Sequence, residues 1–329
     1  MSIYGKYINR FSNNNIEDLY ESIIKETSDN IILFESLDII NESSSILLEV
    51  NIKEKISSIW EKFIKFIKEI FEKIKRFFSR HPFTGTEDML DRAIPKVDSF
   101  SYNLQTLNIE ILDKKYVADI DKDLSNKMKN ISDVVISSSK KVLEYMLEKD
   151  LSGEIDKFFK SFNQSLFGKK KEDMKFTDEI ESEKTKIEDL INRRIEDYDE
   201  MDDQIDSINK SLSDYNITEK EVQVDTQTFI NDSKDFIKSF SSFAEENKRN
   251  ELVFGAYITE IEQEKDRIDH LLSKFDSIKI AKYPLMISKY ISLAAKIYRA
   301  ICNYSEFSIK IFDMGDFEIR RNLKKYCKV

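Results

Sequence analysis

The sequence predicts an all-α protein, built from long helices and antiparallel helical hairpins in an extended bundle with a coiled-coil-like arm. The chain of 329 residues contains only 6 glycines and 3 prolines. Few turns can be made from so few of these residues, so the elements must be long, and long uninterrupted elements are helices. Apolar residues recur at intervals of three and four, which is the helical period. Hydrophobic residues make up 40% of the chain, enough for a substantial core.

Residues 1–55 form an acidic N-terminal leader, for which we predict one or two short helices. The leader carries five basic and ten acidic side chains, a net charge of −5. Short apolar clusters alternate with polar ones, and the runs at 13–15 (Asn) and 43–45 (Ser) mark breaks. Because the next segment is basic, the two segments can pair electrostatically.

Residues 56–80, ISSIWEKFIKFIKEIFEKIKRFFSR, predict a basic amphipathic helix around which the chain is organised. On a helical wheel all apolar side chains fall within one arc of about 160°, and all polar ones fall outside it. The polar face has a net charge of +4, whereas the whole chain has −10. We interpret the apolar side as an interaction face that packs on the protein's own core, on a partner subunit or on a lipid surface. The face consists of Ile56, Ile59, Trp60, Phe63, Ile67, Ile70, Phe71, Ile74, Phe77 and Phe78.

A break at 81–85 separates this helix from a helical bundle over 81–329, because proline and glycine follow each other closely there. Thr84 and Glu87 have the spacing of a capping box for the next helix. The region after Pro95 looks irregular, with one short strand at 109–112. From residue 124 to 145 apolar residues return in alternating steps of four and three, which predicts a helix with one apolar seam.

A coiled-coil hairpin is predicted over about 177–247. Thr177 opens a long polar helix with acidic residues in its first turn, where the helix dipole favours them. A turn at 216–217 follows, and Thr218 with Glu221 has the spacing of a second capping box for the returning helix. The narrow apolar seam of the first helix is typical of a coiled coil, within one chain or between chains. The seam consists of Ile180, Ile187, Ile191, Tyr198, Met201, Ile205, Ile208 and Leu212.

Two further helices complete the predicted bundle. One covers about 251–278, and Pro284 precedes an apolar C-terminal helix at about 285–312. Because this last helix is the most apolar of the C-terminal half, we expect it at the centre of the bundle. Gly315 is expected to end it before a basic tail.

The sequence carries no recognisable catalytic, cofactor or metal motif, so we expect a non-enzymatic protein with no cofactor. The two cysteines, Cys302 and Cys327, are too few for a disulfide framework or a metal site, and the chain has only two histidines. His270 lacks the Glu-x-x-His pattern of carboxylate metal sites, because residue 267 is Arg. The acidic run at 196–206 lacks the glycine turn of a calcium loop and indicates a solvated helix face.

Composition also bears on localisation and partners. The first residues lack the apolar core of a signal peptide, so secretion by that route is not expected. No run of 18 apolar residues exists, so no transmembrane helix is predicted. The acidic chain argues against nucleic acid as the main partner.

The layout of the first ~80 residues resembles that of virion proteins of large tailed bacteriophages of low-GC Gram-positive hosts. The similar features are the opening MSIYGKYINRF, the acidic leader and the basic aromatic helix IWEKFIKFIKEIFEKIKRFFSR, followed by a long coiled-coil-like body. The resemblance implies a structural protein of the virion, in the capsid interior or an assembly core, that is assembled in the host cytoplasm. Residues 47–49, Leu-Leu-Glu, match the context in which one type of phage maturation protease cuts after Glu.

Our leading hypothesis is therefore a non-enzymatic virion structural protein that contacts other virion or assembly subunits through the interaction face and the seam, and forms oligomers. The alternative is a membrane-active or peripheral membrane-binding helical protein that uses the 56–80 helix on a membrane surface. A third hypothesis is a binding module that inhibits an enzyme or takes part in host takeover.

Overall fold

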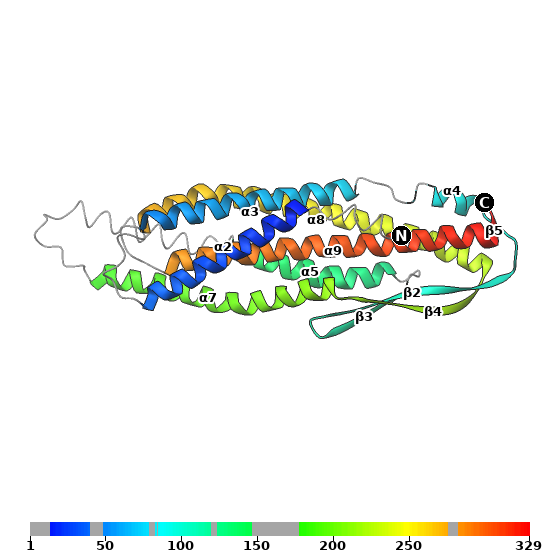
Figure 1. Cartoon of the computed structure of the whole chain (residues 1–329), viewed down its shortest axis with the longest axis horizontal. Coiled ribbons are helices and arrows are strands. Elements are labelled where there is room, and N and C mark those ends of the chain that lie inside the picture. The colour runs from blue at the N-terminus through cyan, green and yellow to red at the C-terminus, as the bar shows by residue number, and fades with distance from the viewer. Residues whose placement is uncertain are drawn as a thin grey trace, which may run out of the picture. The chain divides into compact units, whose positions relative to one another are not determined.

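The computed structural model describes residues 14–39, 49–78, 83, 85–119, 124–146, 178–275 and 282–329 (Figure 1). Of these residues 80% are helical, which confirms a mostly helical protein. The helices are α2 (Asn14–Ile39), α3 (Glu49–Phe78), α4 (Thr86–Arg92), α5 (Leu124–Met146), α7 (Asp178–Ser213), α8 (Thr226–Phe275) and α9 (Lys282–Tyr326). The strands are β1 (Ile94–Pro95), β2 (Ser99–Ile111), β3 (Lys114–Asp119), β4 (Asn216–Asp225) and β5 (Cys327–Lys328).

The chain divides into two compact units, each with its own core. Unit 1 comprises Met1–Phe66, Lys141–Asp203 and Thr259–Ala295, and unit 2 comprises Ile67–Lys140, Gln204–Ile258 and Lys296–Val329. Helices α3, α7, α8 and α9 each contribute one stretch to unit 1 and one to unit 2. The division of the sequence into segments 1–55, 56–80 and 81–329 stays a prediction.

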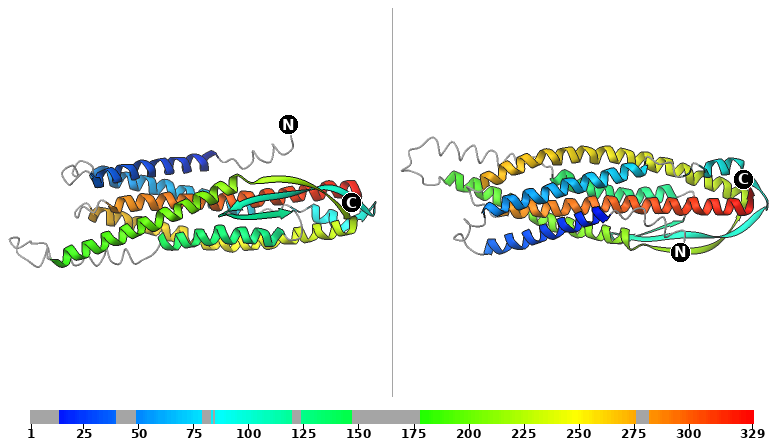
Figure 2. Two further views of the ribbon diagram at one scale, coloured as in Figure 1. Left: turned by 90° about the horizontal axis from the view of Figure 1, so that it is seen from below. Right: turned by 45° about the horizontal axis from the view of Figure 1, so that its top comes forward.

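In unit 1, α2 packs on the first stretch of α3 (Figure 2). Ile23 of α2 is buried, and the ring of Tyr20 lies 5.9 Å from the ring of Phe66. Glu26 of α2 forms an ion pair with Lys62 of α3. Both side chains are about one third exposed, so this pair contributes at most about 1 kcal/mol. The apolar contacts therefore provide most of the stability of this helix pair.

In unit 2, α5 packs on the second stretch of α9. The predicted seam of α5 is buried at Met128, Ile131 and Val135. The hydroxyl of Tyr304, which is 1% exposed, donates a hydrogen bond of 3.3 Å to the carbonyl of Met128. The alternating spacing of four and three residues thus places one side of α5 in the core, as the sequence predicts.

Four phenylalanines form the aromatic core of unit 2. Phe83 lies before α4, Phe236 and Phe240 lie on α8, and Phe312 lies on α9. Ring centroids are 5.0 Å apart for Phe83 and Phe240 and 4.7 Å apart for Phe240 and Phe312, in edge-to-face geometry. Such pairs contribute about 0.5–1.5 kcal/mol beyond the area that they bury. This cluster fixes α8 and α9 side by side near the sheet.

A three-stranded antiparallel sheet of order β3-β2-β4 corrects the prediction of an all-α protein. The register of β2 and β4 pairs Ser99 with Asp225 and Asn108 with Asn216. The second capping box is also wrong, because Thr218 and Glu221 lie within β4. The segment NITEKEVQVD has the β-branched residues and the alternation of a strand, but its partner strand lies more than 100 residues away. The first helix of the predicted hairpin, α7, is therefore followed by strand β4 and not by a tight turn before the chain continues into α8.

The expected short strand at 109–112 is part of a longer strand, β2, which ends at Ile111. Leu112 and Asp113 have φ values of 49° and 62°, and Ile111 pairs with Lys114. Two residues with positive φ between paired strands form the tight hairpin turn that suits strand twist. Leu112 thus belongs to the turn between β2 and β3.

The helix ends differ from the sequence predictions in three places. Gly315 does not end the C-terminal helix, because α9 continues to Tyr326. The helix predicted at 251–278 is the second part of α8, up to Phe275. Helix α4 begins after Gly85 without a side-chain cap, and Thr86 instead donates a hydrogen bond from Oγ1 to Asp316 of α9. Thr84, the residue predicted to cap it, lies outside the described residues.

Candidate functional site

The predicted interaction face of α3 lies in the protein's own cores. In unit 1, Ile56, Ile59, Trp60 and Phe63 are at most 4% exposed. In unit 2, Ile67 and Ile70 are at most 1% exposed. Phe71 and Ile74 are half-buried, and the side chains of Phe77 and Phe78 lie outside the described residues. The sequence left three surfaces on which this face could pack: the protein's own core, a partner subunit or lipid. In the structure, the described part of the face packs in the protein's own core.

The basic side of α3 is partly used within the chain. Lys62 pairs with Glu26 in unit 1, and Lys73 pairs with Glu306 of α9 in unit 2. The Lys73 side chain is 19% exposed, so its pair is the more sheltered of the two. Lys65 and Lys75 are exposed. The positive charge of this segment therefore helps to position α3 inside each unit.

The predicted seam of α7 packs on α9 of the same chain. In unit 1, Ile187, Ile191 and Tyr198 are buried, and in unit 2 Ile205, Ile208 and Leu212 are buried. Met201 is half-buried, and the side chain of Ile180 lies outside the described residues. The seam is therefore occupied within the chain at its described positions.

Polar contacts bracket the α7–α9 seam and set its register. In unit 1, the backbone N–H of Leu293 donates to Tyr198 Oη over 2.8 Å, and Lys289 Nζ lies 2.8 Å from Asp199. In unit 2, Lys296 Nζ lies 2.7 Å from Asp206. Also in unit 2, Asn209 Nδ2 donates to the Lys296 carbonyl over 3.0 Å, and Asn303 Nδ2 donates to Asn209 Oδ1 over 2.9 Å. A shift by one residue along the helices would break these bonds, so the pairing is specific.

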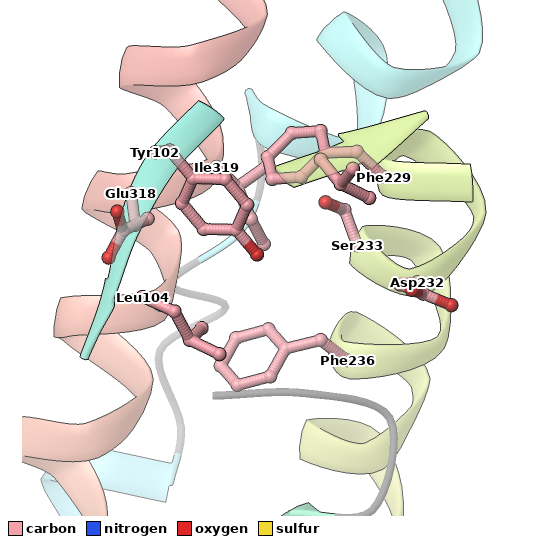
Figure 3. Close-up of a pocket in the computed structure, with 10 residues that line it drawn as sticks. Tyr102, Leu104, Phe229, Asp232, Ser233, Phe236, Glu318 and Ile319 are labelled. Atoms are coloured by element: carbon pink, nitrogen blue, oxygen red, sulfur yellow. The ribbon is translucent and has the colours of Figure 1, made fainter. Parts of the chain in front are cut away.

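A cavity of about 50 Å³ lies in unit 2 between the sheet and the helices α8 and α9 (Figure 3). The hydroxyl of Tyr102 and the side chain of Ser233 are directed toward it, and Glu318 lies on the α9 side of β2. Asp232 lies on the opposite wall with its carboxylate directed away from Glu318. The walls consist of Tyr102, Leu104, Val224, Phe229, Asp232, Ser233, Phe236, Gly315, Glu318 and Ile319.

Glu318 has the most distinctive electrostatic setting at this cavity. Burial is the main cause that raises the pKa of its carboxyl, and the nearby carboxylate of Glu219 on β4 adds to the effect. The charge of Arg321 and the side-chain amide of Asn322 act in the opposite direction, and the resulting pKa is about 7. A half-buried carboxyl with a pKa of about 7 changes its charge within the physiological range. Sequence analysis missed this residue, because strands from distant parts of the chain create its surroundings.

The two cysteines are core residues. Cys302 is 1% exposed, and burial, followed by the charge of Glu306, raises the pKa of its thiol to about 12. Burial also raises the pKa of the Cys327 thiol. A nucleophilic or metal-binding cysteine acts as the thiolate, which these surroundings disfavour.

The acidic run at 196–206 follows the exposed side of α7, and Asp199 and Asp206 are engaged by lysines of α9. Among the described residues, no three His, Cys, Asp or Glu side chains are grouped so that they could hold a metal ion. Nor does any helix in the described ranges combine the length and hydropathy needed to cross a membrane.

No family model matches this chain. Comparisons with curated proteins and with solved structures also find no match.

Proposed function

We propose that this chain is a non-enzymatic structural or assembly protein. The observation that carries the proposal is the association of α7 with α9, in which apolar seam residues alternate with hydrogen bonds and ion pairs that specify one register. Within each unit, these contacts hold the stretches of α7 and α9 together as one packed element. We also propose that α7 acts as the coiled-coil-like arm of this element.

We propose that the protein is a phage virion component of the capsid-interior or assembly-core type, assembled in the host cytoplasm with other virion subunits. The layout of its first ~80 residues supports this assignment. The described parts of the α3 face and the α7 seam are occupied within the chain. Contacts with other subunits are therefore assigned to exposed helical surfaces, such as the acidic side of α7 at Glu196, Glu200 and Asp203.

The membrane-binding alternative requires the apolar side of α3 to be free to contact lipid, because an interfacial helix binds lipid through its apolar side. Here Ile56, Phe63 and Ile67 are fully buried. Membrane binding would require α3 to leave both cores, which would expose many large apolar side chains at roughly 1.5–3 kcal/mol each. This cost favours the structural proposal.

The proposal is tested by measuring the protein in purified particles. Gradient-purified virions are analysed by quantitative mass spectrometry, with a non-structural phage protein as the control. We expect the chain to copurify at a constant ratio to the major capsid protein, whereas the control stays in the lysate. Absence from the particles would overturn the virion assignment. Flotation with vesicles of neutral and anionic lipid tests the alternative, and a structural protein should not float with either.

A further inference from the structure

The end of α9 and the β1–β5 ribbon form a basic surface on unit 2. In the ribbon Ile94 lies opposite Lys328, and Pro95 lies opposite Cys327. Because Cys327 is buried and side chains alternate along a strand, Ile94 and Lys328 lie on the outer side of the ribbon. The basic surface consists of six exposed residues: Ile94, Lys96, Val97, Lys324, Lys325 and Lys328.

Contacts within unit 2 hold the basic surface in place. The backbone N–H of Lys96 donates to the Tyr326 carbonyl over 2.9 Å, and Lys96 Nζ donates to the Lys324 carbonyl over 3.5 Å. The Nζ atom of Lys325 lies 4.7 Å from the centre of the Tyr326 ring, which stacks on Phe100 at 4.0 Å. The positive charges are therefore carried by a packed part of unit 2.

The four lysines of the basic surface form no ion pair with any residue that the structure describes. Acidic side chains are not scarce, because the chain has 62 of them and only 52 basic ones. Lysines elsewhere do pair with carboxylates, as Lys289 does with Asp199 at 2.8 Å. Like charges held side by side raise the electrostatic energy of the free protein, and an anionic partner lowers it.

Helix α7 carries a complementary acidic row in unit 1. The acidic row consists of Glu196, Glu200 and Asp203, which follow at intervals of four and three residues and therefore share one side of the helix over about 10 Å. All three are exposed, and none forms an ion pair or hydrogen bond with another described residue. Arg193, which is also exposed, precedes the acidic row by three residues on the same side.

The exposed side chain of Asp98 bears on which partner fits the basic surface. Asp98 follows Lys96 by two residues, and its backbone carbonyl accepts a hydrogen bond of 2.8 Å from the Thr226 N–H. A uniformly anionic partner, such as a lipid surface or a nucleic acid, would repel this carboxylate. The acidic row with its neighbouring Arg193 instead offers charges of both signs. Ile94 and Val97, 62% and 41% exposed, add the apolar area found in protein–protein interfaces.

We propose that the basic surface binds the acidic row of α7 in a second copy of this chain. The inference rests on the proposed assembly role, and it names the surface that receives the exposed side of α7. Because the two surfaces differ, the contact is head-to-tail, and each bound copy still offers one surface of each kind. Such a contact extends from copy to copy into a ring or a filament.

Sedimentation velocity of the full chain tests this contact. It is measured over a range of protein concentrations at about 0.1 M and about 1 M salt, between which the screening length falls from about 10 to about 3 Å. We expect species larger than the monomer at low salt, growing with concentration, and monomer at high salt. Reversal of either surface, by Lys324→Glu with Lys328→Glu or by Glu196→Lys with Glu200→Lys, should weaken association at least about tenfold.

An equimolar mixture of the two charge-reversed variants provides the decisive measurement. Each variant alone carries like charges on both surfaces, whereas in the mixture every reversed surface meets one of opposite charge. The mixture should therefore associate again. The matched control is Lys129→Glu with Lys248→Glu, which changes the charge equally at exposed positions on α5 and α8 and should associate as the wild type does. Circular dichroism verifies that each variant is folded.

A wild type that is monomeric at low salt would overturn the proposal, as would equal weakening by the control or a mixture of folded variants that stays monomeric. Flotation with anionic vesicles, or a mobility shift with DNA, by a monomeric wild type would assign the basic surface to that partner instead. A monomeric chain that copurifies with virions refutes this inference alone. A self-associating chain that is absent from virions refutes the virion assignment alone.

Discussion

Replacement of Gly315 by alanine sets two opposed effects against each other. Gly315 lies inside α9, where alanine is normally the better helix former by about 1 kcal/mol. A Cβ atom at this position would lie 2.2 Å from Cζ and 2.6 Å from Cε1 of Phe236. Carbon atoms in contact are separated by about 3.5–4.0 Å, so the Phe236 ring would have to move by more than about 1 Å.

The surroundings of Phe236 decide which effect is larger. Its ring is 2% exposed and lies 6.0 Å from Phe83 and 5.3 Å from Phe312. The cavity beside Gly315 and Phe236 leaves some room for the ring. Overpacking costs about 1–3 kcal/mol, and the room available favours the lower half of this range. After the gain in helix propensity of about 1 kcal/mol is subtracted, we expect Gly315→Ala to lower the free energy of unfolding by up to about 1 kcal/mol.

Gly255→Ala on α8 is the matched control. Its Cβ would lie 3.4 Å from Cζ of Phe71, an ordinary contact, so the variant should gain up to about 1 kcal/mol. Both free energies are measured by urea unfolding. In a Phe236→Leu background the cost of Gly315→Ala should shrink, which shows that the ring is its source. A Gly315→Ala protein as stabilised as Gly255→Ala would refute the steric argument.

Three further predictions concern the helices. Ile67→Asp places an unpaired charge in the core of unit 2, so it should lower the stability measured by thermal unfolding by several kcal/mol or abolish assembly. Lys65→Asp on the exposed side of the same helix should change stability and assembly little. An Ile67→Asp protein with normal stability and assembly would contradict the buried face. Membrane binding predicts instead that Ile67→Asp keeps its fold and that Lys65→Asp loses about 1 kcal/mol of affinity for anionic vesicles. Tyr198→Phe removes the hydrogen bond from the Leu293 N–H and should cost about 1 kcal/mol in urea unfolding, with an unchanged stability as the contrary result. Circular dichroism should show helix in more than half of all residues, and a spectrum dominated by sheet would contradict the fold.

The sequence alone determined the long helices and their buried sides. The amphipathic pattern of α3, the seam of α5 and the seam of α7 are local periodicities, and each describes which side of a helix avoids water. Ile67, Ile131 and Ile205 are buried accordingly. The scarcity of glycine and proline also acts locally, because it limits where a helix can stop.

Only the tertiary structure decided what these sides pack against and where the sheet forms. In β2 the buried side changes from Phe100 and Tyr102 to Leu107 and Ile109, so the strand has no continuous period of two. Its pairing with β4 depends on contacts between residues more than 100 positions apart. From the sequence alone, Gly315 could not be distinguished from a glycine that ends a helix. Its position is explained by the ring of Phe236 on α8, which leaves little room for a Cβ atom. The ionisation of Glu318 likewise depends on burial under strands that are remote in sequence, and no local pattern encodes it.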